Sequence, residues 1–266
     1  MTKIIAEIGW NHMGDMNLAA EMISESSKSG ASYAKFQTWK VSRLKSGSWD
    51  SDGRREIYEK AELSTDDHIY LIDTCNKNKI QFLSSAFSIE DAQLLHELGC
   101  KKVKIPSFEC TNRELIDYCN NQFSEIIIST GTATKEEIDD LKQIVNLERT
   151  VVMHCVSSYP CTSSIANLPR IKYLQDNFPR VGYSDHTQGI DVARASINYK
   201  VEYIEKHFTI DNSLPGRDNK FAILPQDIKD LNNYINIFSE ANNFHGIDFQ
   251  PEEKDSRENY RSRFDN

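Results

Sequence analysis

The sequence predicts an α/β fold of the (β/α)8 TIM-barrel type. Short runs rich in Ile and Val alternate eight times with amphipathic segments between residues 3 and 243. Runs that are apolar throughout are typical of parallel strands buried on both faces, and eight such units are expected to close into a barrel. A doubly wound open sheet is the alternative. It is disfavoured because residues 9–14, GWNHMG, do not form the G-x-G-x-x-G turn that binds dinucleotides.

Strands and helices are expected to alternate in order along the chain. The strands are expected at residues 3–8, 32–37, 80–85, 101–105, 125–130, 150–155, 181–184 and 201–207. The helices are expected at residues 17–28, 64–79, 90–98, 112–121, 134–145, up to about 178, 190–199 and 225–243. Ser64 is a predicted helix cap, and Thr134 with Glu137 forms a predicted capping box. Residues 1–245 are therefore predicted to be the barrel domain.

Two segments do not fit the alternation. Residues 38–63 are polar and follow the second strand, so they are predicted to be an inserted loop. Its aromatic residues Trp39, Trp49 and Tyr58 are expected to pack as a lid. Its cations are expected to be solvated rather than to serve a phosphate; they are Arg43, Lys45, Arg54 and Arg55. Residues 246–266 are charged and poor in apolar residues, so they are predicted to be a tail or a linker.

Composition excludes several classes of protein. The 266 residues have a formal net charge of −9, which argues against nucleic-acid binding. No apolar run approaches the roughly 18–20 residues of a membrane span, and no signal peptide is expected at the start of the chain. The six cysteines are scattered without a C-x-x-C pair, so free thiols in a reducing cytoplasm are expected.

Polar and charged side chains collect where the predicted strands end. That end of a barrel carries the active site in enzymes of this fold. The residues concerned are Glu7, Asn11, His12, Lys35, Gln37, Ser84, Ser85, Lys104, Ser107, Glu109, Ser129, Thr130, Gly131, His154, Ser157, Ser158, Tyr159, Ser184, Asp185, His186, Glu205 and His207. Because structural polar residues have no reason to gather at one end of eight strands, the pattern indicates an enzyme.

Charge type narrows the chemistry of this end. Lys35 and Lys104, with the hydroxyls of neighbouring strand ends, can cradle a phosphate or a carboxylate. The hydroxyls are those of Ser107, Ser129, Thr130 and Ser184. Lys101 and Lys102 are instead expected at the surface. Candidate acid–base groups are Glu7, Glu109 and Asp218.

Two histidines at the ends of adjacent strands predict a divalent-metal site. His186 and His207 follow the seventh and eighth runs, so their imidazoles are expected to converge and to hold a metal that acts as a Lewis acid. The alternative is that each is a hydrogen-bonded structural histidine. His12 and His154 are expected to be structural or to hydrogen-bond a substrate.

Taken together, these stretches resemble the sialic acid synthase family. The resemblance rests on motifs that follow the predicted strands in order, up to about residue 250. They are AEIGWNHMG at 6–14, KFQT at 35–38, KIPS at 104–107, STG at 129–131, HCVSSYP at 154–160, GYSDHT at 182–187, EKHFT at 205–209 and PGRD at 215–218.

The resemblance implies an activity and a set of site residues. The reaction is condensation of phosphoenolpyruvate with an N-acylated amino sugar aldehyde, such as N-acetylmannosamine, giving a nonulosonic acid and phosphate by C–O cleavage. It implies a divalent metal, usually Mn²⁺ with Mg²⁺ or Co²⁺ as alternatives, at His186 and His207, and a homodimer. The implied catalytic carboxylates are Glu7, Glu109 and Asp218. The implied phosphoenolpyruvate site is Lys35, Gln37, Lys104, Ser107, Ser129, Ser157, Tyr159 and Ser184.

The chain departs from the family pattern in two ways. Ser157 stands where the family usually has Asn. The family also continues into a small antifreeze-like domain that contacts the sugar of the partner subunit, and this chain ends where that domain would begin, so weak sugar affinity is expected. Two rival readings stay open: a metal-dependent aldolase on the same barrel, and a non-catalytic barrel. A Schiff-base aldolase is disfavoured because the sixth strand ends in Met153 and His154 and offers no Lys.

Overall fold

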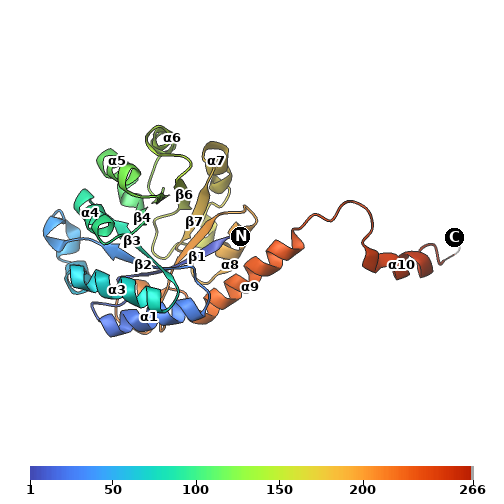
Figure 1. The fold of residues 1–266 in the computed structure, drawn as a ribbon, viewed down its shortest axis with the longest axis horizontal. Coiled ribbons are helices and arrows are strands. Elements are labelled where there is room, and N and C mark those ends of the chain that lie inside the picture. Colours follow the sequence, from blue (N-terminus) through green and yellow to red (C-terminus); the bar gives the residue numbers. More distant parts are fainter. Residues whose placement is uncertain (265–266) are drawn as a thin grey trace.

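The computed structural model describes residues 1–264 and confirms the (β/α)8 barrel. Eight parallel strands form a closed sheet in chain order, surrounded by helices (Figure 1). The strands are β1 Lys3–Gly9, β2 Tyr33–Thr38, β3 Gln81–Ala86, β4 Lys102–Ile105, β5 Glu125–Ser129, β6 Thr150–Cys155, β7 Val181–Asp185 and β8 Tyr203–His207. The last strand pairs with the first, so Glu7 lies opposite His207.

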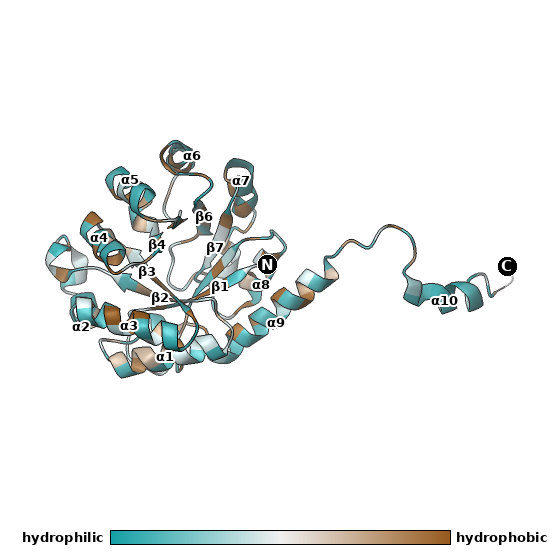
Figure 2. Ribbon diagram, in the orientation of Figure 1, coloured by the Kyte–Doolittle hydropathy of each residue, from teal (hydrophilic) through white to brown (hydrophobic). Residues whose placement is uncertain are grey.

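The helices pack their apolar faces against the outside of the sheet. They are α1 Met16–Lys28, α2 Arg54–Ala61, α3 Thr65–Lys77, α4 Ile89–Glu97, α5 Arg113–Gln122, α6 Lys135–Ile144, α7 Arg170–Asn177, α8 Asp191–Ile197, α9 Pro225–Ala241 and α10 Lys254–Asn259. In Figure 2 the helices around the sheet carry both hydrophobic and hydrophilic residues, as this packing requires. The capping boxes that begin α3 and α6, at Ser64 and Thr134, confirm the predicted helix starts.

The predicted insertion is partly helical. Within residues 38–63 the chain forms α2, whose Tyr58 contacts Trp39 and Trp49 edge-to-face, with ring centroids 5.4 and 5.6 Å apart. Trp39 is buried, whereas Trp49 is half-buried. The aromatic residues therefore form a packed cluster, as the sequence predicts, and they hold the insertion over one side of the barrel mouth.

The interior of the barrel is layered because side chains alternate in direction along each strand. A middle layer is apolar and fully buried; it contains Ile5, Leu83, Ile127, Val151 and Met153. The next inward positions toward the carboxyl ends of the strands are polar, for example Glu7 two residues after Ile5 and Ser129 two residues after Ile127. The apolar layer therefore lies directly beneath the polar side chains at the mouth of the barrel.

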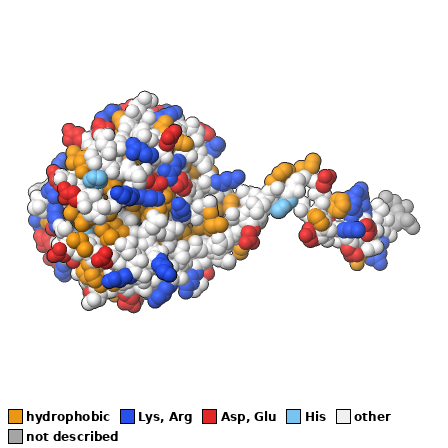
Figure 3. All heavy atoms as spheres, in the orientation of Figure 1, with side chains coloured by type: hydrophobic (Ala, Val, Ile, Leu, Met, Phe, Trp, Pro, Cys, Tyr) orange, Lys and Arg blue, Asp and Glu red, His pale blue; other side chains and the backbone are white. Residues whose placement is uncertain are grey.

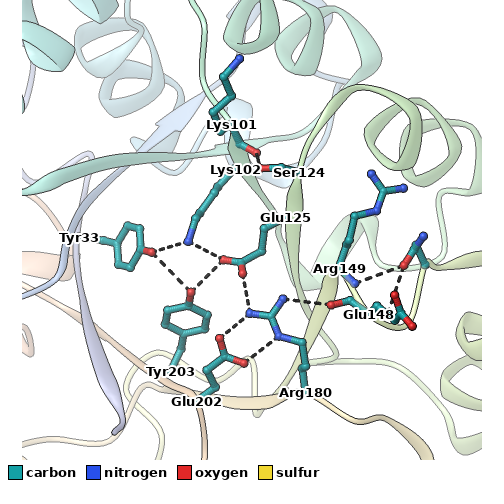
Figure 4. A network of polar contacts seen from close by, with 11 residues as sticks. Tyr33, Lys101, Lys102, Ser124, Glu125, Glu148, Arg149, Arg180, Glu202 and Tyr203 are labelled. Carbon is teal, nitrogen blue, oxygen red and sulfur yellow. Dashed lines mark hydrogen bonds and ion pairs between the residues drawn. The ribbon is translucent and has the colours of Figure 1, made fainter.

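The opposite end of the barrel is closed by a polar network (Figure 4). Glu125 accepts a hydrogen bond of 2.8 Å from Tyr203 and pairs with Lys102 at 2.9 Å and Arg180 at 2.5 Å. Lys102 also donates to the Tyr33 hydroxyl at 2.7 Å. The expectation that Lys102 lies at the surface holds only in part: its side chain is 27% exposed, and its ammonium group pairs with Glu125.

The chain continues beyond the barrel after α9. Residues 243–264 extend away from the body and include α10 (Figure 1). Figure 3 shows hydrophobic side chains on this segment beside charged ones, and Phe244, Ile247, Phe249 and Tyr260 are exposed. Among residues 1–264, no helix combines the length and the apolar character that a membrane crossing needs.

Candidate active site

A cavity of about 530 Å³ lies at the carboxyl ends of the strands. Cavities of this size bind small-molecule ligands. It brings together most residues that the sequence singled out. Those that line it are Glu7, Lys35, Gln37, Lys104, Ser107, Ser129, Tyr159, Ser184, His186, His207 and Asp218.

The floor of the cavity is a cluster of two ammonium and two carboxylate groups. Lys35 Nζ lies 3.1 Å from Glu7 Oε2 and 3.2 Å from Glu205 Oε2, and Lys104 Nζ lies 3.6 Å from Glu205 Oε1. Each of these residues is at most 5% exposed. Oε1 of each carboxylate also accepts a hydrogen bond, from Gln37 on Glu7 at 2.7 Å and from Ser184 on Glu205 at 2.9 Å. The four charges are therefore fixed in position and shielded from water.

Burial and mutual attraction shift the pKa values of this cluster in different directions. Burial raises the pKa of Glu7 because Lys35 only partly offsets it. Burial alone would raise the pKa of Glu205 too, but Lys104 and Lys35 bring that pKa down to about 2. Burial opposes the charge of Lys35, yet Glu205 and Glu7 raise its pKa, whereas burial lowers the pKa of Lys104. Glu7 is therefore the carboxylate best suited to exchange a proton.

His186 and His207 converge at the mouth, as their place on β7 and β8 predicts. Their ring centroids are 5.3 Å apart. Asp218 lies beside them, with Oδ2 3.5 Å from His207 Nδ1. Burial lowers the pKa of His207 far below its usual value, which favours the neutral imidazole that a metal ion binds, and its Nδ1 is buried without a hydrogen-bond partner.

This donor set fits a divalent cation held by two imidazoles, with Asp218 as the nearest carboxylate. Within residues 1–264, no group of three or more His, Cys, Asp or Glu side chains is already arranged around a metal position. The remaining coordination positions would therefore fall to water and substrate, which is the open arrangement of catalytic metal sites.

Trp10 ties the inserted segment to Asp218. Its indole Nε1 donates a hydrogen bond of 2.6 Å to Asp218 Oδ2. Its ring packs against Tyr58 with centroids 4.9 Å apart and against Trp39 at 6.0 Å. The aromatic cluster of the insertion therefore fixes the orientation of a carboxylate beside the histidine pair.

The hydroxyl groups of Ser107 and Ser157 meet around Gly131. The backbone N–H of Gly131 donates to Ser107 Oγ at 3.0 Å. A Cβ atom at position 131 would lie 2.1 Å from Ser157 Oγ and 2.7 Å from Ser107 Oγ, so only glycine allows this close approach. Ser157 is therefore adjacent to the cavity through Gly131, although it is not part of the lining.

Ten of the sequence-selected strand-end residues lie outside the cavity lining; they are Asn11, His12, Ser84, Glu109, Thr130, Gly131, His154, Ser157, Ser158 and Asp185. Glu109 belongs to the short helix η3 Ser107–Glu109, where its carboxylate accepts a hydrogen bond of 2.8 Å from Asn112. His12 and His154 are fully buried outside the lining. His12 Nδ1 accepts from the Gly14 N–H at 3.1 Å, and His154 Nε2 donates to the Ala166 carbonyl at 2.7 Å, so both are structural.

Several lining residues had no role in the sequence-based prediction. Glu205 was noted only as a strand-end residue, yet it is the shared partner of both lysines; its position two residues before His207 was the available signal. Arg54, which was expected to be solvated, lines the cavity together with Arg217 and Lys220. Cys155 lies 3.7 Å from His186 Nδ1. No local pattern distinguishes these four from surface residues.

The fold and the site together define a barrel protein with a buried anion pocket beside a pair of histidines. A family model described as the NeuB family matches residues 22–245, and the chain belongs to this family. The resemblance to sialic acid synthases is thereby confirmed.

Curated relatives in the family are synthases of nonulosonic acids. The N,N'-diacetyllegionaminic acid synthase of Legionella pneumophila is 37% identical over 86% of this chain and 69% of the relative. The enzyme of the same name from Campylobacter jejuni is 36% identical over 90% of this chain and 77% of the relative. An N-acetylneuraminate-9-phosphate synthase from Drosophila melanogaster is 32% identical over 88% of this chain and 67% of the relative.

Solved structures agree in fold. The N-acetylneuraminic acid synthetase of Leptospira borgpetersenii, determined in complex with citrate, superimposes with a TM-score of 0.85 at 29% identity, over 98% of this chain and 93% of that one. The spore coat polysaccharide biosynthesis protein SpsE of Bacillus subtilis gives 0.80 at 29% identity, over 90% and 68%.

Proposed function

We propose that this protein condenses phosphoenolpyruvate with an N-acylated amino sugar in its open aldehyde form, releasing phosphate and a nonulosonic acid. The main observation behind this proposal is the charged cluster at the floor of the cavity, next to the histidine pair. The cluster consists of Lys35, Lys104, Glu7 and Glu205, and the histidines are His186 and His207. Two ammonium groups at one point suit a substrate with both a phosphate and a carboxylate. The names of the curated relatives support the same reaction class.

The floor residues can supply most of the chemistry. Lys35 and Lys104 neutralise the phosphate and carboxylate of phosphoenolpyruvate, and the hydroxyls of Ser107 and Ser129 donate to their oxygens, while Ser184 keeps Glu205 in place. C3 of phosphoenolpyruvate attacks the aldehyde carbon, and positive charge develops at C2. Water then adds to C2, with Glu7 accepting one of its protons and returning it to the alkoxide formed from the aldehyde. The tetrahedral centre expels phosphate by C–O cleavage, and the second proton leaves with the phosphate as C2 becomes the keto group.

The sugar end of the reaction lies at the mouth. His186 and His207 would hold a divalent ion, with Mn²⁺ the first candidate, which when bound supplies Lewis acidity at the aldehyde oxygen. Asp218, oriented by Trp10, is placed to accept hydrogen bonds from sugar hydroxyls. Tyr159 contacts His186 with ring centroids 4.3 Å apart and closes this side.

A panel assay tests the proposal. Phosphate release from phosphoenolpyruvate is measured with Mn²⁺ and, in turn, N-acetylmannosamine, its 6-phosphate and diacetamido hexoses. We expect release with at least one sugar and none without sugar. No release with any sugar, despite binding of phosphoenolpyruvate, contradicts the proposal and favours a non-catalytic barrel. Turnover with pyruvate in place of phosphoenolpyruvate favours an aldolase.

The position of bond cleavage has a separate test. Phosphoenolpyruvate labelled with ¹⁸O at the bridging oxygen is expected to pass its label to the released phosphate, because water supplies the new C2 oxygen. Mass spectrometry of both products reads the outcome. Label retained in the keto acid and absent from phosphate would rule out C–O cleavage.

A further inference from the structure

We propose that the amino sugar used by this protein is anionic, with a phosphate monoester or a carboxylate at the end farthest from the aldehyde, and that Arg217 and Lys220, assisted by Arg54, bind this group at the cavity rim. The inference rests on the proposed function and specifies the class of its second substrate.

The charge on the cavity lining is unevenly distributed. Five cationic and three carboxylate side chains line it, in a chain whose formal net charge is −9. At the floor the charges balance, since Lys35 and Lys104 face Glu7 and Glu205. The positive surplus therefore lies at the rim, where Arg54, Arg217 and Lys220 face a single lining carboxylate.

That one carboxylate is already engaged. Asp218 accepts the hydrogen bond of Trp10 and lies beside His207. Arg54 pairs with Asp52 at 2.7 Å. Within residues 1–264, Arg217 and Lys220 form no ion pair shorter than 4.0 Å, and both side chains are exposed. Two cations at the mouth of a substrate cavity thus have no direct ion-pair partner among the described residues.

The rim cations are tied to the reacting centre by the backbone. Arg217 directly precedes the short helix η5 Asp218–Lys220, so the anchoring of Asp218 fixes the residues on either side of it. Arg54, Arg217 and Lys220 line the same cavity as Asp218, and Arg217 and Lys220 are exposed whereas Asp218 is buried.

The chemistry of these groups selects an anion with several oxygens. A guanidinium offers a planar fork that matches a phosphate or carboxylate, and an ammonium adds a point charge. A neutral hexosamine would leave both cations facing only water. A phosphate ester or a carboxylate at the far end of the sugar would pair with them while the aldehyde lies near His186 and His207.

Substrate preference and its loss in a rim variant test the inference. The wild type is assayed for phosphate release from phosphoenolpyruvate with N-acetylmannosamine 6-phosphate, with N-acetylmannosaminuronate and with neutral N-acetylmannosamine. We expect kcat/KM to be at least about tenfold higher for one anionic sugar. In Arg217→Ala the ratio of kcat/KM between that sugar and the neutral one is expected to fall about 10- to 100-fold.

A matched control separates this effect from net charge. Arg113→Ala removes an exposed arginine on α5 outside the cavity lining and is expected to keep the wild-type ratio. Circular dichroism checks that both variants are folded. Equal or better use of the neutral sugar by the wild type overturns the inference, as does an unchanged ratio in Arg217→Ala or an effect confined to the KM of phosphoenolpyruvate. Those results leave the proposed function standing, which fails only if no sugar gives phosphate release.

Discussion

Glu7 has the position and the environment of a proton acceptor. Burial raises the pKa of its carboxyl. We expect Glu7→Gln to lower kcat by about 10²- to 10⁴-fold, the usual contribution of a general base. Stability should change little, because Lys35 keeps Glu205 as a partner at 3.2 Å. Phosphate-release kinetics and urea unfolding measure both quantities.

The neighbouring carboxylate provides the contrast. Glu205→Gln removes the shared partner of Lys35 and Lys104, so it is expected to lower the free energy of unfolding by about 3–5 kcal/mol. A Glu7→Gln enzyme with wild-type kcat would show that Glu7 only balances charge.

Trp10 is expected to act as a positioning residue for Asp218. Trp10→Phe keeps the aromatic packing but removes the N–H that donates to the carboxylate at 2.6 Å. The free energy of unfolding should fall by about 1–2 kcal/mol, as for the loss of a hydrogen bond to a charged group. The KM for the sugar should rise about tenfold while the KM for phosphoenolpyruvate stays constant. Trp49→Phe, which alters the same cluster without touching Asp218, serves as the control; equal kinetics in the two variants would refute the role.

At the scale of elements, the two ends of the barrel are expected to separate stability from activity. Glu125→Gln weakens the network with Lys102, Arg180 and Tyr203 at the closed end. We expect the free energy of unfolding to fall by about 2–3 kcal/mol with kcat unchanged. Urea unfolding and steady-state assays measure this, and the exposed Glu240→Gln on α9 is the control. A large drop in kcat in Glu125→Gln under conditions where the variant is fully folded would contradict the idea that the two ends serve stability and activity separately.

The loop after β5 is expected to be intolerant of a side chain at Gly131. Gly131→Ala places a methyl group against Ser157 and Ser107, so both hydroxyls must move. The KM for phosphoenolpyruvate should rise at least about tenfold. Adding Ser157→Ala removes the closest clash, so the double variant should recover part of the affinity. An unchanged KM in the single variant would show that these hydroxyls do not contact the substrate.

The strands, most helices and the ends of the strands were predictable because each follows from the pattern of apolar and polar residues in a short stretch of sequence. Apolar runs set the eight strands, and strand ends set which side chains reach the mouth, so Lys35, Lys104, His186 and His207 could be placed together. Helix α2 was missed because its mean composition is polar and its anchor, Tyr58, packs on Trp10 and Trp39 from other segments.

At the scale of the whole molecule, stability is expected to depend on pH through two buried histidines. Burial lowers the pKa of His12 and of His154 to about 4. Between about pH 6.5 and pH 4, these histidines bind protons in the unfolded chain, where their pKa is near 6.5, but stay neutral in the folded chain. Above pH 6.5 the histidines are neutral in both states and cost no stability. At pH 5 the free energy of unfolding should be lower than above pH 6.5 by about 2 kcal/mol per histidine.

Urea unfolding at several pH values measures this slope. His154→Gln should reduce the slope by about one proton between pH 6.5 and pH 4. His96→Gln, at an exposed position on α4, should leave the slope as in the wild type. An unaltered slope in His154→Gln would contradict the assignment.

Contacts between distant residues mark the limit of sequence reasoning. The pairing of Glu205 with Lys35 and Lys104 depends on how eight strands close, and no spacing along the chain specifies it. The rim position of Arg217 likewise follows from the hydrogen bond between Asp218 and Trp10, more than two hundred residues earlier. The homodimer, the cytoplasmic location and the weak sugar affinity stay predictions.

The pairing of β1 with β8 also sets the order of events during synthesis. Lys3 pairs with Tyr203, and Glu7 with His207. At about 5–20 residues per second, a ribosome needs on the order of 10–40 s to make the chain between these partners. During that time one edge of β1 is unpaired, and the charged cluster around Glu7 lacks Glu205 on β8. A nascent chain therefore gains its reactive centre only when the eighth strand emerges, so an interrupted translation product would carry the lysines but not the site.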